Sequence, residues 1–174
     1  MALCLILGGA RSGKSSFAMR AAESYAAETL TTPLLIATAE ALDEEMTVRI
    51  SQHRAARSKS WRVIEEPVEI AAKIQDSSES GAPIVVDCLT LWISNLMMRE
   101  RPLGTAMDDL LQAIAAQPRE IILVANEVGL GIVPEHALGR HFRDEAGRAN
   151  QRLAAHADTV FFMIEGLPMT VIAL

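Results

Sequence analysis

An octapeptide near the start of the chain has the residue types and the spacing of a phosphate-binding loop. It follows the pattern G-x-x-x-x-G-K-S and consists of Gly8, Gly9, Ala10, Arg11, Ser12, Gly13, Lys14 and Ser15. Glycines permit backbone angles that let successive N–H groups turn toward an anion. Lys14 is expected to reach the β- and γ-phosphates of a nucleotide, and Ser15 to offer its hydroxyl to Mg²⁺. The motif therefore predicts nucleotide binding.

A carboxylate at the end of an apolar run is the second candidate. Residues 83–86 read Pro-Ile-Val-Val, and Asp87 follows them. P-loop enzymes hold Mg²⁺ or its water with such an acid. We expect Asp87 to act from the end of a strand beside the P-loop. Because aspartate is common after apolar strands, the P-loop gives this assignment most of its weight.

His53 lies among arginines in a segment that reads as a helix. Met46, Ile50 and Arg57 have the spacing that places them near the helical face of this histidine, and Arg49 lies one turn before it. Neighbouring positive charge disfavours the protonated imidazole, and a neutral ring nitrogen is what a nucleophile must offer. On these grounds alone, His53 is either a surface histidine or a nucleophile.

The elements that must position these residues alternate between strands and helices. Mostly apolar runs predict strands at residues 2–7, 34–38, 83–87, 120–125, 159–164 and 169–173, and residues 61–65 read as a short strand that ends on a carboxylate. The unbroken apolar character of residues 34–38 suits a sheet that is covered on both faces. Predicted helices cover residues 16–27, 43–57, 67–75, 89–98, 103–116 and 139–157. This order predicts a P-loop NTPase-like, doubly wound, mostly parallel α/β sheet with helices on both faces. A turn at 165–168 is expected to join a C-terminal antiparallel strand pair.

Composition narrows the class of protein. The 174 residues, 50% of them hydrophobic, suit one transferase domain over residues 1–174. The formal net charge of −6 argues against nucleic acid or an anionic membrane surface as the main partner. Cys4 and Cys88 lie in apolar runs without a spaced cysteine pattern, and no apolar run approaches the roughly 20 residues that span a bilayer. We expect a cytoplasmic protein without membrane insertion.

A P-loop alone does not separate a kinase, a GTPase switch and an ATP-driven machine. A GTPase is expected to carry an Asn-Lys-x-Asp element that reads guanine, but the segment 126–129 reads Asn-Glu-Val-Gly. A mechanical ATPase usually has more domains than this length can hold. A small-molecule transferase fits best, and a nucleotide-binding regulatory switch is the alternative from another class.

Taken together, the motifs resemble the family of bifunctional adenosylcobinamide kinase / adenosylcobinamide-phosphate guanylyltransferases. The resemblance rests on the P-loop, on Ala37-Thr38, on residues 43–53, and above all on residues 126–135 and 139–154. It implies that ATP or GTP phosphorylates adenosylcobinamide, and that GTP then donates GMP to the product, giving adenosylcobinamide-GDP and pyrophosphate. These reactions belong to assembly of the nucleotide loop of cobalamin. A kinase that has lost GMP transfer is a further alternative.

The resemblance also implies roles for individual residues. His53 matches the histidine that carries GMP covalently in such enzymes, and with Lys14 it forms the expected catalytic pair. The guanine nucleotide site maps onto Gly8 to Ser15, Ala37, Thr38, Ala39, Arg54, Ala55, Ala56, Arg57, Glu65 and Asp87. Ser15 and Asp87 are the expected Mg²⁺ ligands. A homo-oligomer, and specifically a trimer, is the expected assembly.

Two departures from the family pattern are visible. A typical member has a histidine pair where Gln52 and His53 stand here, so this chain keeps one candidate nucleophile. That member also has glutamate where Asp87 stands, so the charge is kept but the reach is one methylene shorter.

The loop at 126–134 fits a substrate contact, a subunit contact or a structural turn equally well.

Overall fold

A seven-stranded sheet forms the centre of the part of the chain that the structure describes. This computed structural model describes residues 2–55, 60–77 and 81–173, without the side chains of Arg49, His53 and Ala173. The strands are β1 (Ala2–Gly8), β2 (Leu34–Ala37), β3 (Arg62–Glu65), β4 (Ile84–Asp87), β5 (Glu120–Val124), β6 (Thr159–Ile164) and β7 (Leu167–Ala173). The helices are α1 (Lys14–Thr29), α2 (Glu44–Ala55), α3 (Ile70–Asp76), α4 (Leu89–Met98), α5 (Leu103–Ala115) and α6 (Ala137–Ala154).

The strand order is β3-β2-β4-β5-β1-β6-β7, in which β1 to β6 are parallel and β7 pairs antiparallel with β6. The prediction of a mostly parallel α/β sheet with a C-terminal antiparallel pair is confirmed. The order also shows that the strand that ends in Asp87 does not pair with the P-loop strand. β5 lies between β4 and β1. Each strand pattern reports burial but not the identity of its neighbours, so the sequence could not show this.

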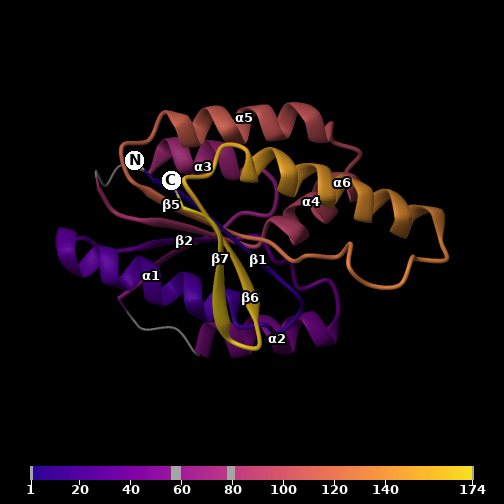
Figure 1. Cartoon of the computed structure of the whole chain (residues 1–174), viewed down its shortest axis with the longest axis horizontal. Helices are drawn as coiled ribbons and strands as arrows, with labels where there is room; N and C mark the ends of the chain where they lie inside the picture. Colours follow the sequence, from indigo (N-terminus) through magenta and orange to yellow (C-terminus); the bar gives the residue numbers. More distant parts are fainter. Residues whose placement is uncertain (1, 56–59, 78–80, 174) are drawn as a thin grey trace.

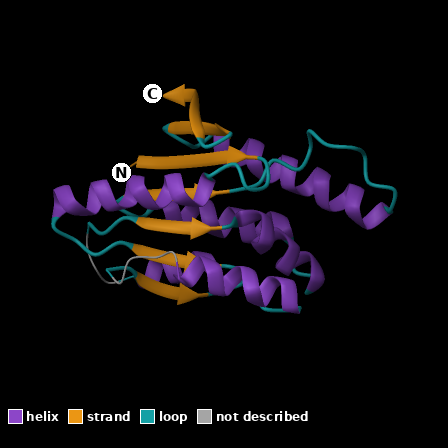
Figure 2. Cartoon of the chain, turned by 90° about the horizontal axis from the view of Figure 1, so that it is seen from below, coloured by secondary structure: helices purple, strands orange, loops and turns teal. Residues whose placement is uncertain are grey.

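Helices cover both faces of the sheet, with α1 and α2 on one side and α3 to α6 on the other (Figures 1 and 2). Alternate residues of β1 enter two separate cores because successive side chains of a strand point to opposite faces. Leu3 and Leu5 join the core under α3 to α6, whereas Cys4 and Ile6 join the core under α1. Burial on both faces explains the unbroken apolar runs that predicted these strands.

Two predicted boundaries differ from the structure for local reasons. The expected turn at 165–168 is only Glu165-Gly166, whose φ angles of 47° and 84° suit a two-residue hairpin turn. Pro168 therefore lies within β7, where an edge strand tolerates a missing N–H. The predicted helix at 67–75 begins later, at Ile70, because the Glu66 carboxylate accepts the N–H groups of residues 68 and 69 in a preceding turn.

Among the helices that the structure describes, none combines the length with the apolar character that crossing a bilayer requires.

Candidate active site

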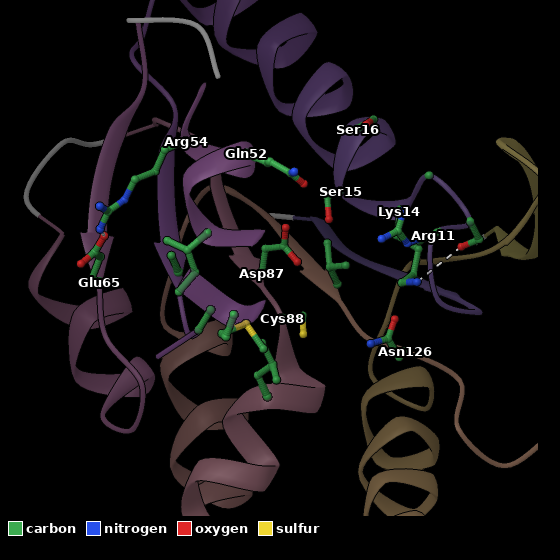
Figure 3. Close-up of a pocket in the computed structure, with 18 residues that line it drawn as sticks. Arg11, Lys14, Ser15, Ser16, Gln52, Arg54, Glu65, Asp87, Cys88 and Asn126 are labelled. Carbon is green, nitrogen blue, oxygen red and sulfur yellow. Dashed lines mark hydrogen bonds and ion pairs between the residues drawn. The ribbon is translucent and has the colours of Figure 1, made fainter. Parts of the chain in front are cut away.

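A cavity of about 340 Å³ opens at the carboxyl ends of the parallel strands. Residues at or just beyond the ends of β1 to β5 line it, which is where open α/β sheets bind ligands. Figure 3 shows Lys14 and Ser15 entering from one side, Asp87 from the centre, and Arg54 and Glu65 from the opposite side. The cavity therefore joins the P-loop to the helix that carries His53.

The side chain of Lys14 is buried against the P-loop backbone. Lys14 is only 6% exposed, and its Nζ donates to the carbonyl oxygen of Gly9 at 2.5 Å. Left-handed backbone angles at Arg11, with φ 58°, and at Gly13, with φ 90°, form the loop. Helix α1 begins at Lys14, so its positive end faces the cavity. The loop thus presents a buried cation and a helix N-terminus to an anion.

The turn between β6 and β7 packs against the P-loop. The N–H of Gly166 donates to the carbonyl oxygen of Ser12 at 3.1 Å. A Cβ placed on Gly13 would lie 3.2 Å from Cα of Gly166, and one placed on Gly8 would lie 2.7 Å from the carbonyl oxygen of Met163. Both P-loop glycines are therefore required by close backbone approach as well as by their positive φ angles.

Helix α2 forms the outer wall of the cavity. Asp43 caps the helix, because its Oδ1 accepts the N–H of Met46 at 2.7 Å. Met46 and Ile50 are half-buried and line the cavity, and Gln52 and Arg54 also line it. Near the other end of α2, Arg54 forms an ion pair with Glu65. This ion pair is more than half exposed, so it contributes little to stability.

A buried polar network lies directly behind this wall. Thr38 is completely buried, and its hydroxyl donates to the carbonyl oxygen of Cys88 at 2.7 Å while accepting the N–H of Cys88 at 2.8 Å. Burial, reinforced by the charge of Asp87, raises the pKa of the Cys88 thiol to about 11. Cys88 is therefore a neutral thiol at physiological pH, which disfavours a role as nucleophile.

The predicted residues fall into three groups in the structure. Those that line the cavity are Arg11, Ser12, Gly13, Lys14, Ser15, Ala37, Ala39, Arg54, Glu65 and Asp87. Gly8, Gly9 and Ala10 belong to the P-loop but do not line the cavity, Thr38 lies in the buried network with Cys88, and Ala55 is exposed at the end of α2. The backbone of His53 belongs to α2, whereas its side chain, Ala56 and Arg57 lie outside the described residues.

Other lining residues received no assigned role from sequence reasoning. They include Ser16, Met46, Ile50, Gln52, Cys88, Leu91, Val124 and Asn126. The helical spacing of Met46 and Ile50 relative to His53 was the available signal for α2. Asn126 is the second residue after β5, and its N–H donates to the hydroxyl of Thr90 at 2.6 Å. The intervening position of β5 brings Asn126 between the P-loop and Asp87.

Cavity-lining oxygen atoms suit a magnesium ion. The Ser15 hydroxyl and the Asp87 carboxylate belong to the same cavity. Mg²⁺ usually binds through one or two carboxylates together with substrate phosphates and waters. The donor set therefore fits the ion in the presence of a nucleotide.

Solved structures of other proteins share the fold at low sequence identity. The flagellar accessory protein FlaH from Methanocaldococcus jannaschii aligns with a TM-score of 0.54 and 14% identity, covering 99% of this chain and 78% of FlaH. A protein from Pyrococcus horikoshii OT3 aligns with a TM-score of 0.55 and 9% identity, covering 99% and 87%. At these identities the likeness extends to the fold alone.

Sequence relatives are much closer. The bifunctional adenosylcobalamin biosynthesis protein CobP from Pseudomonas aeruginosa is 47% identical over 167 residues, covering 95% of this chain and 94% of CobP. The proteins named CobU with the same description are 36% identical in Escherichia coli and 38% identical in Salmonella typhimurium, each covering 95% of this chain and 97% of the relative.

Residues 4–171 match the family described as cobinamide kinase / cobinamide phosphate guanyltransferase, which confirms the resemblance inferred from the motifs. That match favours a transferase over a regulatory switch, because both activities in the description transfer a group. From this match and the curated relatives, the chain belongs to the cobinamide kinase / cobinamide phosphate guanyltransferase family.

Proposed function

We propose that this cavity carries out two successive reactions in the biosynthesis of cobalamin. A nucleoside triphosphate, ATP or GTP, first phosphorylates the aminopropanol hydroxyl of adenosylcobinamide. GTP then donates GMP to the resulting phosphate, giving adenosylcobinamide-GDP and pyrophosphate. The observation that carries the proposal is the joining of a P-loop and helix α2 in one cavity, in a chain whose family pairs a kinase with a guanyltransferase.

The kinase step would rely on the P-loop. The substrate hydroxyl oxygen bonds to the γ-phosphorus, the bond from that phosphorus to the bridging oxygen breaks, and a nucleoside diphosphate leaves as the hydroxyl proton is released. Lys14 and the loop N–H groups stabilise the negative charge that moves onto the leaving group. Because Lys14 is already held on the loop by the Gly9 carbonyl, little reorganisation is needed when phosphate binds.

Guanylyl transfer would use His53 as the transient carrier. A ring nitrogen of His53 attacks the α-phosphorus of GTP, the bond from that phosphorus to the bridging oxygen breaks, and pyrophosphate leaves. A phosphate oxygen of adenosylcobinamide phosphate then attacks the same phosphorus, and the P–N bond breaks to restore the imidazole. Splitting one displacement into two is the advantage of covalent catalysis. Backbone position 53 lies between Gln52 and Arg54, both of which line the cavity.

The nucleotide would contact residues from both sides of the cavity. We assign Gly8 to Ser15 to the phosphates, and Ala37 to Ala39, Arg54 to Arg57 and Glu65 to the remainder of the guanine nucleotide. Ser15 and Asp87 would hold Mg²⁺, which when bound neutralises phosphate charge. The support is that most of these described residues line one continuous cavity.

We also propose that the protein works as a cytoplasmic homo-oligomer, specifically a trimer, with the corrinoid bound partly between subunits. The support is apolar surface on the edge strand β7, where Leu167, Met169 and Val171 are each at least half exposed. The loop after Asn126 also carries exposed apolar residues, since Leu130 and Ile132 are 80% and 97% exposed.

The decisive experiment is incubation of the purified protein with Mg²⁺ and GTP labelled at either the α- or the γ-phosphorus. We expect label from the α-position alone to remain on denatured protein, to be lost in acid and to survive alkali, as a histidine phosphoramidate does. His53→Ala should abolish this label while sparing γ-phosphate transfer to adenosylcobinamide. Label that persists in His53→Ala would remove the proposed carrier.

The same experiment separates the alternatives. A kinase without GMP transfer would phosphorylate adenosylcobinamide but leave no α-label on the protein. A regulatory switch would bind GTP and GDP with different affinities for a partner and turn over slowly. Either result would contradict the two-step proposal.

A further inference from the structure

We propose that Asn95 of helix α4 and Arg99, which follows the last residue of α4, position helix α2 for guanylyl transfer. Neither side chain is among the residues that line the cavity in the described part of the chain. The inference rests on the proposed function, because it concerns the helix that carries the proposed nucleophile. Asn95 and Arg99 are therefore positioning residues and do not touch the substrate.

Asn95 ties two connections of the sheet to α4. Its side chain is buried, with the residue only 4% exposed, and its Nδ2 donates to the carbonyl oxygen of Thr38 at 2.8 Å and to that of Pro67 at 3.1 Å. These carbonyls belong to the connections that follow β2 and β3. Because a side-chain amide nitrogen has two donors, both are used here. One amide thus fixes the spacing between two segments that lead to cavity walls.

Thr38 is held from a second direction as well. Its hydroxyl makes both hydrogen bonds to Cys88, next to Asp87 at the end of β4. The start of the connection from β2 to α2 is therefore attached to α4 on one side and to β4 on the other. Buried hydrogen bonds of this kind are costly to break, because the separated groups have no water to replace their partners.

Arg99 attaches the same connection two residues later. Its NH2 group donates to both carboxylate oxygens of Glu40 at 2.8 Å, and its NH1 group donates to the carbonyl oxygen of Asn95 at 3.2 Å. Leu42 then folds back onto the Glu40 carbonyl oxygen, with an N–O distance of 3.0 Å, and Asp43 caps α2. The first turn of α2 thus begins only a few residues after Thr38 and Glu40, which Asn95 and Arg99 hold in place.

The remainder of α2 offers few contacts that would hold it in place. Most of its described side chains are exposed, and Met46 and Ile50 are only half-buried. Near its C-terminal end, the Arg54–Glu65 ion pair is solvent-exposed and therefore weak. Among the described residues, the connection anchored by Asn95 and Arg99 consequently provides the firmest attachment of α2.

This arrangement separates the two reactions. The kinase step depends on the P-loop between β1 and α1, which makes none of these contacts with α4. Guanylyl transfer additionally requires α2 to bring position 53 to the α-phosphorus. A displacement of about 1 Å can lower the rate of such a step by up to about 100-fold. Loosening the α4 contacts should therefore reduce formation of the GMP–enzyme and spare γ-phosphate transfer.

The test compares Arg99→Ala, Glu40→Gln and Asn95→Ala with a matched control, Arg101→Ala. Arg101 makes a similar ion pair, also at 2.8 Å, but its partner Glu69 lies in the connection before α3. Single-turnover incorporation of α-label from GTP is measured beside γ-phosphate transfer to adenosylcobinamide on the same preparations, with thermal unfolding as a check on folding.

For Arg99→Ala and Glu40→Gln we expect α-label incorporation to slow by about 3- to 10-fold, and for Asn95→Ala by about 10-fold or more, with γ-transfer changed less than about 2-fold. Arg101→Ala should change neither rate. Exchange of the charges in the double variant Arg99→Glu with Glu40→Arg should restore much of the lost α-label incorporation.

Equal losses in both reactions, or no loss in either, would overturn the positioning role. If Asn95→Ala fails to fold, the partly exposed pair Arg99 and Glu40 still decides the question. Failure of the wild-type protein to form any α-label adduct would instead refute the proposed carrier, so the two failures are distinguishable.

Discussion

Replacing Thr38 by valine should destabilise the protein by about 2–4 kcal/mol. Valine keeps the branched shape, so no cavity forms, but it removes a hydroxyl that makes two buried hydrogen bonds to the backbone of Cys88. The Cys88 carbonyl oxygen keeps a partner, because it also accepts the N–H of Trp92 at 3.1 Å. The Cys88 N–H loses the hydroxyl as its acceptor. About 1–3 kcal/mol for that N–H and about 1 kcal/mol for the lost bond to the carbonyl give the total.

Urea denaturation followed by tryptophan fluorescence would measure this loss, because Trp61 and Trp92 are both buried. In a chain of this length, the expected fall in Tm is about 4–16 °C. Thr38→Ser is the matched control, since it keeps the hydroxyl and should cost less than about 1.5 kcal/mol. A loss below about 0.5 kcal/mol for Thr38→Val, or an equal loss for both variants, would refute the reasoning.

Two further predictions concern the P-loop and the thiols. Lys14→Ala should lower both γ-transfer and guanylyl transfer by about 100-fold or more, because a buried phosphate-facing cation is lost; assays of both reactions on one folded preparation would check it, and retention of either activity would contradict it. Burial raises the pKa of Cys4 to about 12 and that of Cys88 to about 11, so native protein at pH 8 should react slowly with a thiol reagent and denatured protein rapidly. Because folding favours the protonated thiols, their contribution to stability is complete below pH 9.0 and declines as the pH rises toward 11 and 12. Unfolding midpoints measured between pH 8 and 11 would show this decline.

The sequence allowed the layers of the fold and the P-loop to be predicted, because both depend on local pattern. Unbroken apolar runs mark strands that are covered on both faces, and the spacing of Gly8, Gly13 and Lys14 marks the loop. The order of strands was beyond such reasoning, since any apolar parallel strand can pair with any other. This is why β5, and with it Asn126, was not expected between the P-loop strand and Asp87.

The hydrogen-bond network of Asn95 and Thr38 could not be predicted from the sequence for a different reason. Asn95 is one polar residue in an otherwise apolar helical segment, and its partners are carbonyl groups 57 and 28 positions away in the chain. Backbone acceptors carry no signature in a sequence, so the role of such an amide emerges only in three dimensions. Thr38 is a similar case, because its hydroxyl bonds to the backbone of Cys88, which lies 50 positions away in the chain.

The pairing of β1 has a consequence for the folding of the chain during its synthesis on the ribosome. β1 precedes the other described strands in the chain, yet its two neighbours are β5, which begins at Glu120, and β6, which begins at Thr159. The contact of Gly166 with Ser12 on the P-loop also joins residues far apart in the chain. Because non-local pairings form late and leave apolar strands uncovered, β1 must be kept from aggregating until β5 and β6 have been made.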